Sequence, residues 1–125
     1  MKITAKILLS VILLLFMVHL AILLQILPYN IVWGGKLNSV AEMYFFETVS
    51  ALITLIFGFV VAIKANVINI KLPKNIVQSV LWIFFFFFIL NTIGNLLAKT
   101  YTEKIFSIVT IVFVLLLWKL LKSKE

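Results

Sequence analysis

Four long apolar runs, separated by short polar segments, dominate the pattern of this sequence. They cover residues 7–27, 43–63, 76–97 and 105–121. At about 1.5 Å per residue, each run forms a helix of roughly 25 to 33 Å, close to the roughly 30 Å hydrocarbon core of a bilayer. The pattern therefore predicts an all-α membrane protein. We expect a bundle of four transmembrane helices with short loops, and a single integral membrane domain over residues 1–125.

Residues at the ends of these runs favour helix starts and stops. Pro28 ends the first run, and Pro73 is expected in the first turn of the third helix. Ser39 and Glu42 have the spacing of a capping box before the second run, and segment 100–103 offers another before the fourth. The first run is longer than a signal-peptide core and lacks a small-residue cleavage motif, so we expect a retained span.

The composition narrows the possible chemistry. Hydrophobic residues make up 65% of the chain and charged residues 12%, with a mean hydropathy of +1.27, which is not typical of a soluble domain. The chain has no cysteine, aspartate or arginine and only one histidine, His19. This set excludes an intrachain Ser-His-Asp triad, a thiolate or multi-histidine metal site, and an iron–sulfur cluster. No cofactor or metal site is expected, and nucleic-acid binding is not expected either.

Lysine placement predicts the orientation of the bundle. Eight of the eleven lysines lie in the N-terminal segment, the 64–75 loop and the C-terminal tail, whereas Lys36, Lys99 and Lys104 lie on the opposite side. Lysines are enriched in cytoplasmic loops, so both termini are predicted to be cytoplasmic. We expect a bacterial cytoplasmic (inner) membrane location, with the Trp33-containing loop outside.

Polar side chains within the runs gather in the half of the bilayer that this orientation places outside. Asn91 and Asn95 are four residues apart and share a helix face, and Glu103, Ser107 and Thr110 also share one. Glu47 shares its face with small residues, the kind that membrane helices use for close approach. A polar cluster inside the outer half of the bundle is therefore expected. Its candidate ligand-binding residues are Glu47, Asn91, Asn95, Gln25, Ser107, Thr110, Trp33 and His19.

Two interpretations of this cluster remain open. It can be a pocket whose carboxylate exchanges protons or binds a cationic group, because ionisable residues inside membranes are commonly functional. It can equally hold the helices together, with Glu47 paired to Lys36, Lys99 or an amide. His19 lies about 13 Å below Pro28, near the midplane. A hydrogen bond from His19 to Thr54 or Asn91 is favoured over a proton relay with Glu47.

The aromatic segment 82–88, Trp-Ile-Phe-Phe-Phe-Phe-Phe, sweeps more than one helical turn, so its rings cannot all face one pocket. Phe84 and Phe88 lie on the stripe of Asn91 and Asn95. We expect these two rings to form the floor of the polar cluster, and the remaining ones to include lipid-facing side chains. Trp82 and Trp118 are expected nearer the cytoplasmic side.

Three classes of function follow. The most specific is a small protein that binds or transports a small molecule, an ion or a lipid through an outward-facing pocket. The alternative is a non-catalytic subunit or an assembly partner of a larger membrane complex, and a homodimer is possible. An enzyme acting on a lipid or quinone is least favoured, because no nucleophile or cofactor motif accompanies Glu47. The four spans are similar to those of small multidrug resistance transporters, but the first run lacks that family's glutamate.

Overall fold

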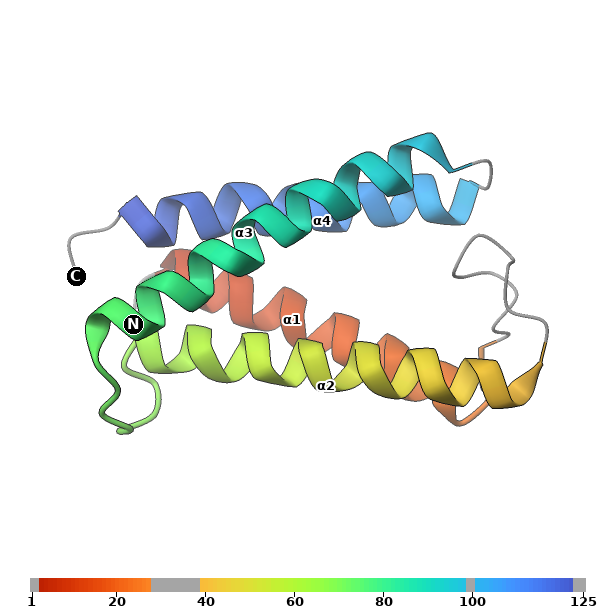
Figure 1. The fold of residues 1–125 in the computed structure, drawn as a ribbon, viewed down its shortest axis with the longest axis horizontal. Helices are drawn as coiled ribbons and strands as arrows, with labels where there is room; N and C mark the ends of the chain where they lie inside the picture. The colour runs from red at the N-terminus through yellow and green to blue at the C-terminus, as the bar shows by residue number, and fades with distance from the viewer. Residues whose placement is uncertain (1–2, 28–38, 99–100, 123–125) are drawn as a thin grey trace.

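The computed structural model describes residues 3–27, 39–98 and 101–122, and these form four helices. They are α1 (Ile3–Leu23), α2 (Val40–Lys64), α3 (Lys74–Leu97) and α4 (Tyr101–Lys122) (Figure 1). The described residues contain no strand, so the all-α prediction is confirmed for them. With 21 to 25 residues, each helix is long and apolar enough to cross a membrane. The chain is thus consistent with an integral membrane protein.

The helices pack as two antiparallel pairs, α1 with α2 and α3 with α4 (Figure 1). Smaller contacts of α1 with α4 and of α2 with α3 join the pairs. Ile3, Lys122 and the 65–73 connection lie at one end of the bundle, which we call the terminal end. Toward the opposite end, the far end, the two pairs separate.

The main apolar core extends from the middle of the bundle to the terminal end. Phe57 of α2 is 1% exposed and lies at its centre. Its ring centroid is 4.9 Å from those of Phe84 and Phe88 and 5.5 Å from that of Phe113, so the aromatic side chains of α2, α3 and α4 meet here. The core also contains Ala5, Leu8, Ile12, Val61, Leu81 and Leu117. A much smaller cluster, Ile22 with Met43, joins α1 and α2 near the far end, and Phe106 of α4 packs against it.

Close approach and polar contacts reinforce the terminal half. A Cβ atom added at Gly58 would lie 3.2 Å from Cγ2 of Ile12, so α1 and α2 approach closely there. Lys64 donates a hydrogen bond of 3.0 Å to Oε1 of Gln78, and Nε2 of Gln78 donates one of 3.1 Å to the carbonyl of Leu121. These contacts join α2, α3 and α4 at the end where the apolar core also holds them together.

The helix ends agree with the sequence in one case and differ in two. The Ser39 hydroxyl accepts a hydrogen bond from the Glu42 amide, as predicted for a cap. Pro73 is the N-cap of α3 and does not lie in its first turn. The first helix ends at Leu23 and not at residue 27, because Gln25 adopts a φ of 60° in a Schellman motif, in which the Ile26 amide bonds to the Ala21 carbonyl. Thr100 lies outside the described residues.

The aromatic core yields a stability prediction. Phe57→Ala should lower the free energy of unfolding by up to about 3 kcal/mol, the low end for a buried phenylalanine in a soluble core. The estimate is low because packing, and not transfer out of water, drives helix association in lipid. The measurement is denaturant unfolding of the protein in detergent micelles. Phe59, on the same helix but 48% exposed, is the matched control, and equal losses for Phe57→Ala and Phe59→Ala would contradict the placement of the core.

Candidate ligand-binding cavity

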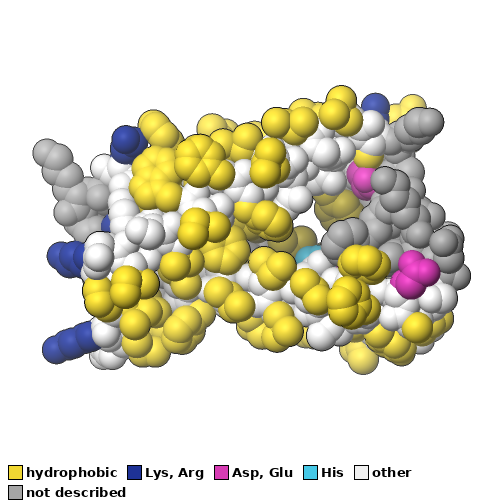
Figure 2. All heavy atoms as spheres, in the orientation of Figure 1, with side chains coloured by type: hydrophobic (Ala, Val, Ile, Leu, Met, Phe, Trp, Pro, Cys, Tyr) yellow, Lys and Arg dark blue, Asp and Glu magenta, His cyan; other side chains and the backbone are white. Residues whose placement is uncertain are grey.

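A cavity of about 590 Å³ lies between the two helix pairs in the far half of the bundle. Figure 2 shows it as a hollow between α3 and α2, with the single histidine of the chain visible inside. All four helices contribute side chains to it. The residues that line it are Leu15, Val18, His19, Ile22, Glu47, Val49, Ser50, Ile53, Thr54, Phe57, Phe87, Phe88, Asn91, Gly94, Asn95, Glu103, Phe106, Val109 and Thr110.

The wall formed by α1 and α2 carries an ionisable pair. Nδ1 of His19 lies 2.5 Å from Oε2 of Glu47, and the two side chains are 17% and 1% exposed. Such a short contact requires a proton between the two atoms, donated either by the imidazole or by the carboxyl group. Below this pair, the Thr54 hydroxyl donates a hydrogen bond of 2.8 Å to the Ser50 carbonyl.

The sequence favoured Thr54 or Asn91 as the hydrogen-bond partner of His19, and the structure instead places His19 against Glu47. Because α1 ends at Leu23, His19 lies only about 6 Å from that helix end. Glu47 is seven residues into α2, which begins at Val40. It therefore lies about 10 Å along the helix axis from the start of α2. The packing of α1 against α2 places His19 and Glu47 at the same level, where their side chains meet.

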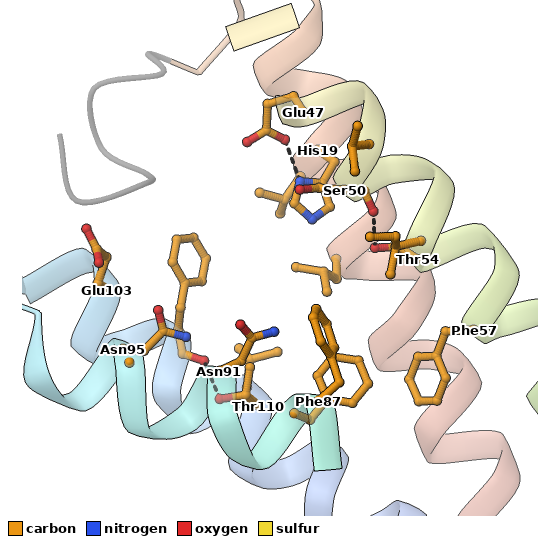
Figure 3. A pocket seen from close by; sticks show the side chains of 18 of the residues that line it. His19, Glu47, Ser50, Thr54, Phe57, Phe87, Asn91, Asn95, Glu103 and Thr110 are labelled. Carbon is orange, nitrogen blue, oxygen red and sulfur yellow. Dashed lines mark hydrogen bonds and ion pairs between the residues drawn. The ribbon is translucent and has the colours of Figure 1, made fainter. Parts of the chain in front are cut away.

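The wall formed by α3 and α4 carries amides, a hydroxyl and a second carboxyl group. Figure 3 shows Asn91, Asn95, Glu103 and Thr110 on the opposite side of the cavity from His19 and Glu47. The hydroxyl oxygens of Thr92 and Thr110 lie 2.8 Å apart and join α3 to α4. Two sets of hydrogen-bonding groups therefore face each other across a space lined mainly by apolar side chains.

Aromatic rings form the side of the cavity that faces the apolar core. Phe57, Phe87 and Phe88 line it at this side, and Phe106 lines the wall of α4. The expected floor is confirmed for Phe88. Phe84 does not line the cavity but stacks on Phe88, with ring centroids 6.1 Å apart, so it supports the floor from the core side.

Five of the eight predicted site residues line the cavity, namely His19, Glu47, Asn91, Asn95 and Thr110. Gln25 lies beyond the end of α1, is exposed, and donates a hydrogen bond of 3.1 Å to the Tyr44 hydroxyl. Ser107 is buried, and its hydroxyl donates to the Lys104 carbonyl on its own helix. Trp33 lies outside the described residues.

The sequence prediction did not assign Ser50, Phe57, Phe87 or Glu103 to the site. Glu103 lies four residues before Ser107, and this spacing places it on the face of Ser107 and Thr110. That signal was sufficient to find it. The same kind of signal exists for Phe87, which lies four residues before Asn91, and for Phe57, which lies three residues after Thr54.

The arrangement supports binding and proton exchange. The His19–Glu47 pair can hold or release a proton at Nδ1 or Oε2, and the opposing amides can accept or donate hydrogen bonds. Within the ranges that the structure describes, no three His, Cys, Asp or Glu side chains are grouped so as to hold a metal ion. Comparisons of this chain with protein-family models, curated proteins and solved structures find no match. The function of this chain is therefore inferred from the geometry of the cavity.

The His19–Glu47 contact predicts strong coupling between the two side chains. His19→Ala and Glu47→Ala should each destabilise the protein, because each leaves a buried polar partner without its hydrogen bond, at a cost of about 1 to 3 kcal/mol. The double variant should lose clearly less stability than the two single losses together. Unfolding free energies of the four proteins in detergent provide the double-mutant cycle. Additive losses in the free energy of unfolding would contradict the contact. A second double-mutant cycle, between His19 and Thr54, is the control and should show additive losses.

Proposed function

We propose that this chain is an integral membrane protein whose cavity opens to the outer face of a bacterial cytoplasmic membrane and binds or transports a small molecule, ion or lipid. In this proposal both termini are cytoplasmic. Apolar side chains that point away from the bundle on all four helices, such as Leu14, Leu52, Ile83 and Ile108, support lipid as the surrounding solvent.

The distribution of charge supports the orientation. Lys6, Lys64, Lys71, Lys74, Lys119 and Lys122 lie toward the terminal end, where Figure 2 shows most of the lysines. The three glutamates within the described residues lie in the far half, at positions 42, 47 and 103. Positively charged segments stay in the cytoplasm during insertion, so this asymmetry favours a cytoplasmic terminal end and an outward-facing cavity.

The observation that carries the proposal is the cavity itself. Its volume of about 590 Å³ falls within the range of roughly 300 to 1,000 Å³ typical of small-molecule sites. Such sites combine mainly apolar walls with a few polar groups that orient the ligand. Here those groups come from all four helices and converge at one level of the bundle, as Figure 3 shows.

A purely structural role accounts less well for this arrangement. Polar residues that hold membrane helices together do so by contact across a helix interface. At the far end, the His19–Glu47 contact lies within the first helix pair and the Thr92–Thr110 contact lies within the second. His19, Glu47 and Thr110 also line the cavity between the pairs. The polar side chains thus stabilise each pair and leave groups directed at the cavity.

The orientation can be tested by cysteine labelling, since the chain contains no cysteine. Lys71→Cys lies in the connection at the terminal end and Tyr101→Cys at the 87% exposed start of α4. In intact bacterial cells, a membrane-impermeant maleimide should label Tyr101→Cys and not Lys71→Cys. Permeabilised cells, in which both should react, provide the control. The reverse pattern in intact cells would overturn the outward orientation of the cavity.

Binding can be tested by native mass spectrometry after mild detergent extraction. The wild-type protein should retain a small molecule or lipid in stoichiometric amount, and Glu47→Gln should reduce its occupancy several-fold while the protein stays folded. Glu42→Gln is the matched control, because Glu42 lies at the same end but does not line the cavity. Occupancy equal in all three proteins would contradict the proposed site. A stoichiometric partner protein in place of a small molecule would favour the alternative function, a subunit of a larger membrane complex.

A further inference from the structure

We propose that the ligand is an uncharged lipid whose head group carries carbonyl or hydroxyl oxygens. The head lies against Asn91 and Asn95, and the chain leaves through the opening between α2 and α3. This inference rests on the proposed function and specifies the chemical class of the ligand and its route. It follows from the amides of the lining, from the open space beside α3, and from the side of the bundle on which the hollow opens.

The carboxamides of Asn91 and Asn95 are two polar groups of the cavity that a ligand can engage. Both side chains line the cavity and are partly buried. Neither carboxamide makes a hydrogen bond to any residue that the structure describes. Figure 3 shows the carboxamide of Asn91 pointing into the cavity. A polar group in apolar surroundings costs free energy until it is hydrogen-bonded, so these amides stabilise a ligand that places oxygen atoms beside them.

The ionisable side chains of the lining already have partners. Nδ1 of His19 contacts Oε2 of Glu47, and Glu103 has an interaction of its own within the chain. A charged head group that leaves water needs an opposite charge available to pair with it. An uncharged head group needs only hydrogen bonds, and a carboxamide both donates and accepts them. The lining therefore favours an uncharged ligand with carbonyl or hydroxyl oxygens.

The backbone of α3 at Gly94 adjoins open space. Gly94 lines the cavity, and a Cβ atom added there would meet no atom within 4 Å among the described residues beyond its neighbours on the helix. At Gly58, by contrast, an added Cβ atom would lie 3.2 Å from Cγ2 of Ile12. Gly58 thus permits close packing of two helices, whereas Gly94 leaves room next to Asn95 that a head group can fill.

The route of the chain follows from the position of the hollow. Figure 2 views the bundle from the side, and the histidine is visible in the hollow between α3 and α2. Val49 of α2 and Phe87 of α3 line the cavity and are 41% and 39% exposed, so the cavity reaches the lateral surface at both helices. In a bilayer a lateral surface of this kind faces acyl chains. A lipid can therefore place its head group at the amides while its chain stays among those of the bilayer.

Defined lipids titrated into the detergent-solubilised protein, with bound copies counted by native mass spectrometry, test the ligand class. Dioctanoylglycerol and decylubiquinone carry uncharged oxygens, and at least one of them should bind saturably. The one that binds more tightly distinguishes a glycerolipid from a quinone as the source of the head group. Dioctanoylphosphatidylglycerol, which has the same chains as the first lipid but a charged head, should bind more weakly. Decylbenzene, which has no oxygen, should not bind.

Variants of α3 test the position of the head group. Asn91→Leu and Asn95→Leu should each weaken binding of the preferred lipid about tenfold, because hydrogen bonds to it are lost. The thermal unfolding temperature should not fall in either variant, since neither amide has a described partner to lose. Gly94→Leu fills the open space and should also weaken binding, while leucine favours the helix more than glycine does. Asn75→Leu, on the same helix but outside the cavity, should leave the affinity unchanged.

Three results would overturn this inference. They are tighter binding of the charged lipid than of either uncharged one, unchanged affinity in both asparagine variants, and a lower unfolding temperature in both, which would make the amides structural. If the wild-type protein retains a charged molecule on extraction from cells and binds neither uncharged probe, only this inference fails. If it retains nothing and binds none of the probes, the proposed function fails as well.

Discussion

The contact between His19 and Glu47 is the constraint on which the far half of the bundle depends. An ionisable side chain that is 1% exposed in an apolar chain must be paired, since neither lipid nor a packed core supplies hydrogen bonds. By pairing with His19, Glu47 stays inside the bundle and joins α1 to α2 near the apolar Ile22–Met43 cluster. The second helix pair has its own contact, between Thr92 and Thr110. The pairs also meet in this half, where Phe106 of α4 packs against the Ile22–Met43 cluster, and the cavity lies beside this contact.

In the terminal half, by contrast, apolar packing joins the two helix pairs. There the rings of Phe57, Phe84, Phe88 and Phe113 fill the space between pairs, and the hydrogen bonds of Gln78 join α2, α3 and α4. Dispersion contacts grow with close packing, and in lipid they are a main source of helix association. The bundle is thus closed by packing at one end and lined by polar groups at the other. This division places the cavity next to a closely packed core.

Much of this architecture could be predicted from the sequence, because apolar runs and helical spacing are local properties. The four helices and the inward face of Glu47, Asn91, Asn95 and Thr110 follow from them. Helical spacing left Thr54, Asn91 and Glu47 open as partners of His19, because it does not show how α1 and α2 are aligned along their axes. The end of α1 was also hard to predict, since the left-handed Gln25 ends that helix without the glycine or asparagine usual at such a site. Gln25 and Ser107 do not line the cavity: Gln25 lies past the end of α1, and Ser107, although buried as expected, donates its hydrogen bond within its own helix.

The most direct measurement of the central claim uses the single histidine as a probe. In the protein reconstituted into lipid bilayers with ¹⁵N-histidine, nuclear magnetic resonance reports the protonation and hydrogen bonding of both ring nitrogens of His19 alone. The structure predicts that the Nδ1 resonance shifts in Glu47→Gln and is unchanged in Glu42→Gln, because the Nδ1 atom contacts Glu47 at 2.5 Å. A spectrum that is identical in wild type and Glu47→Gln would contradict the account.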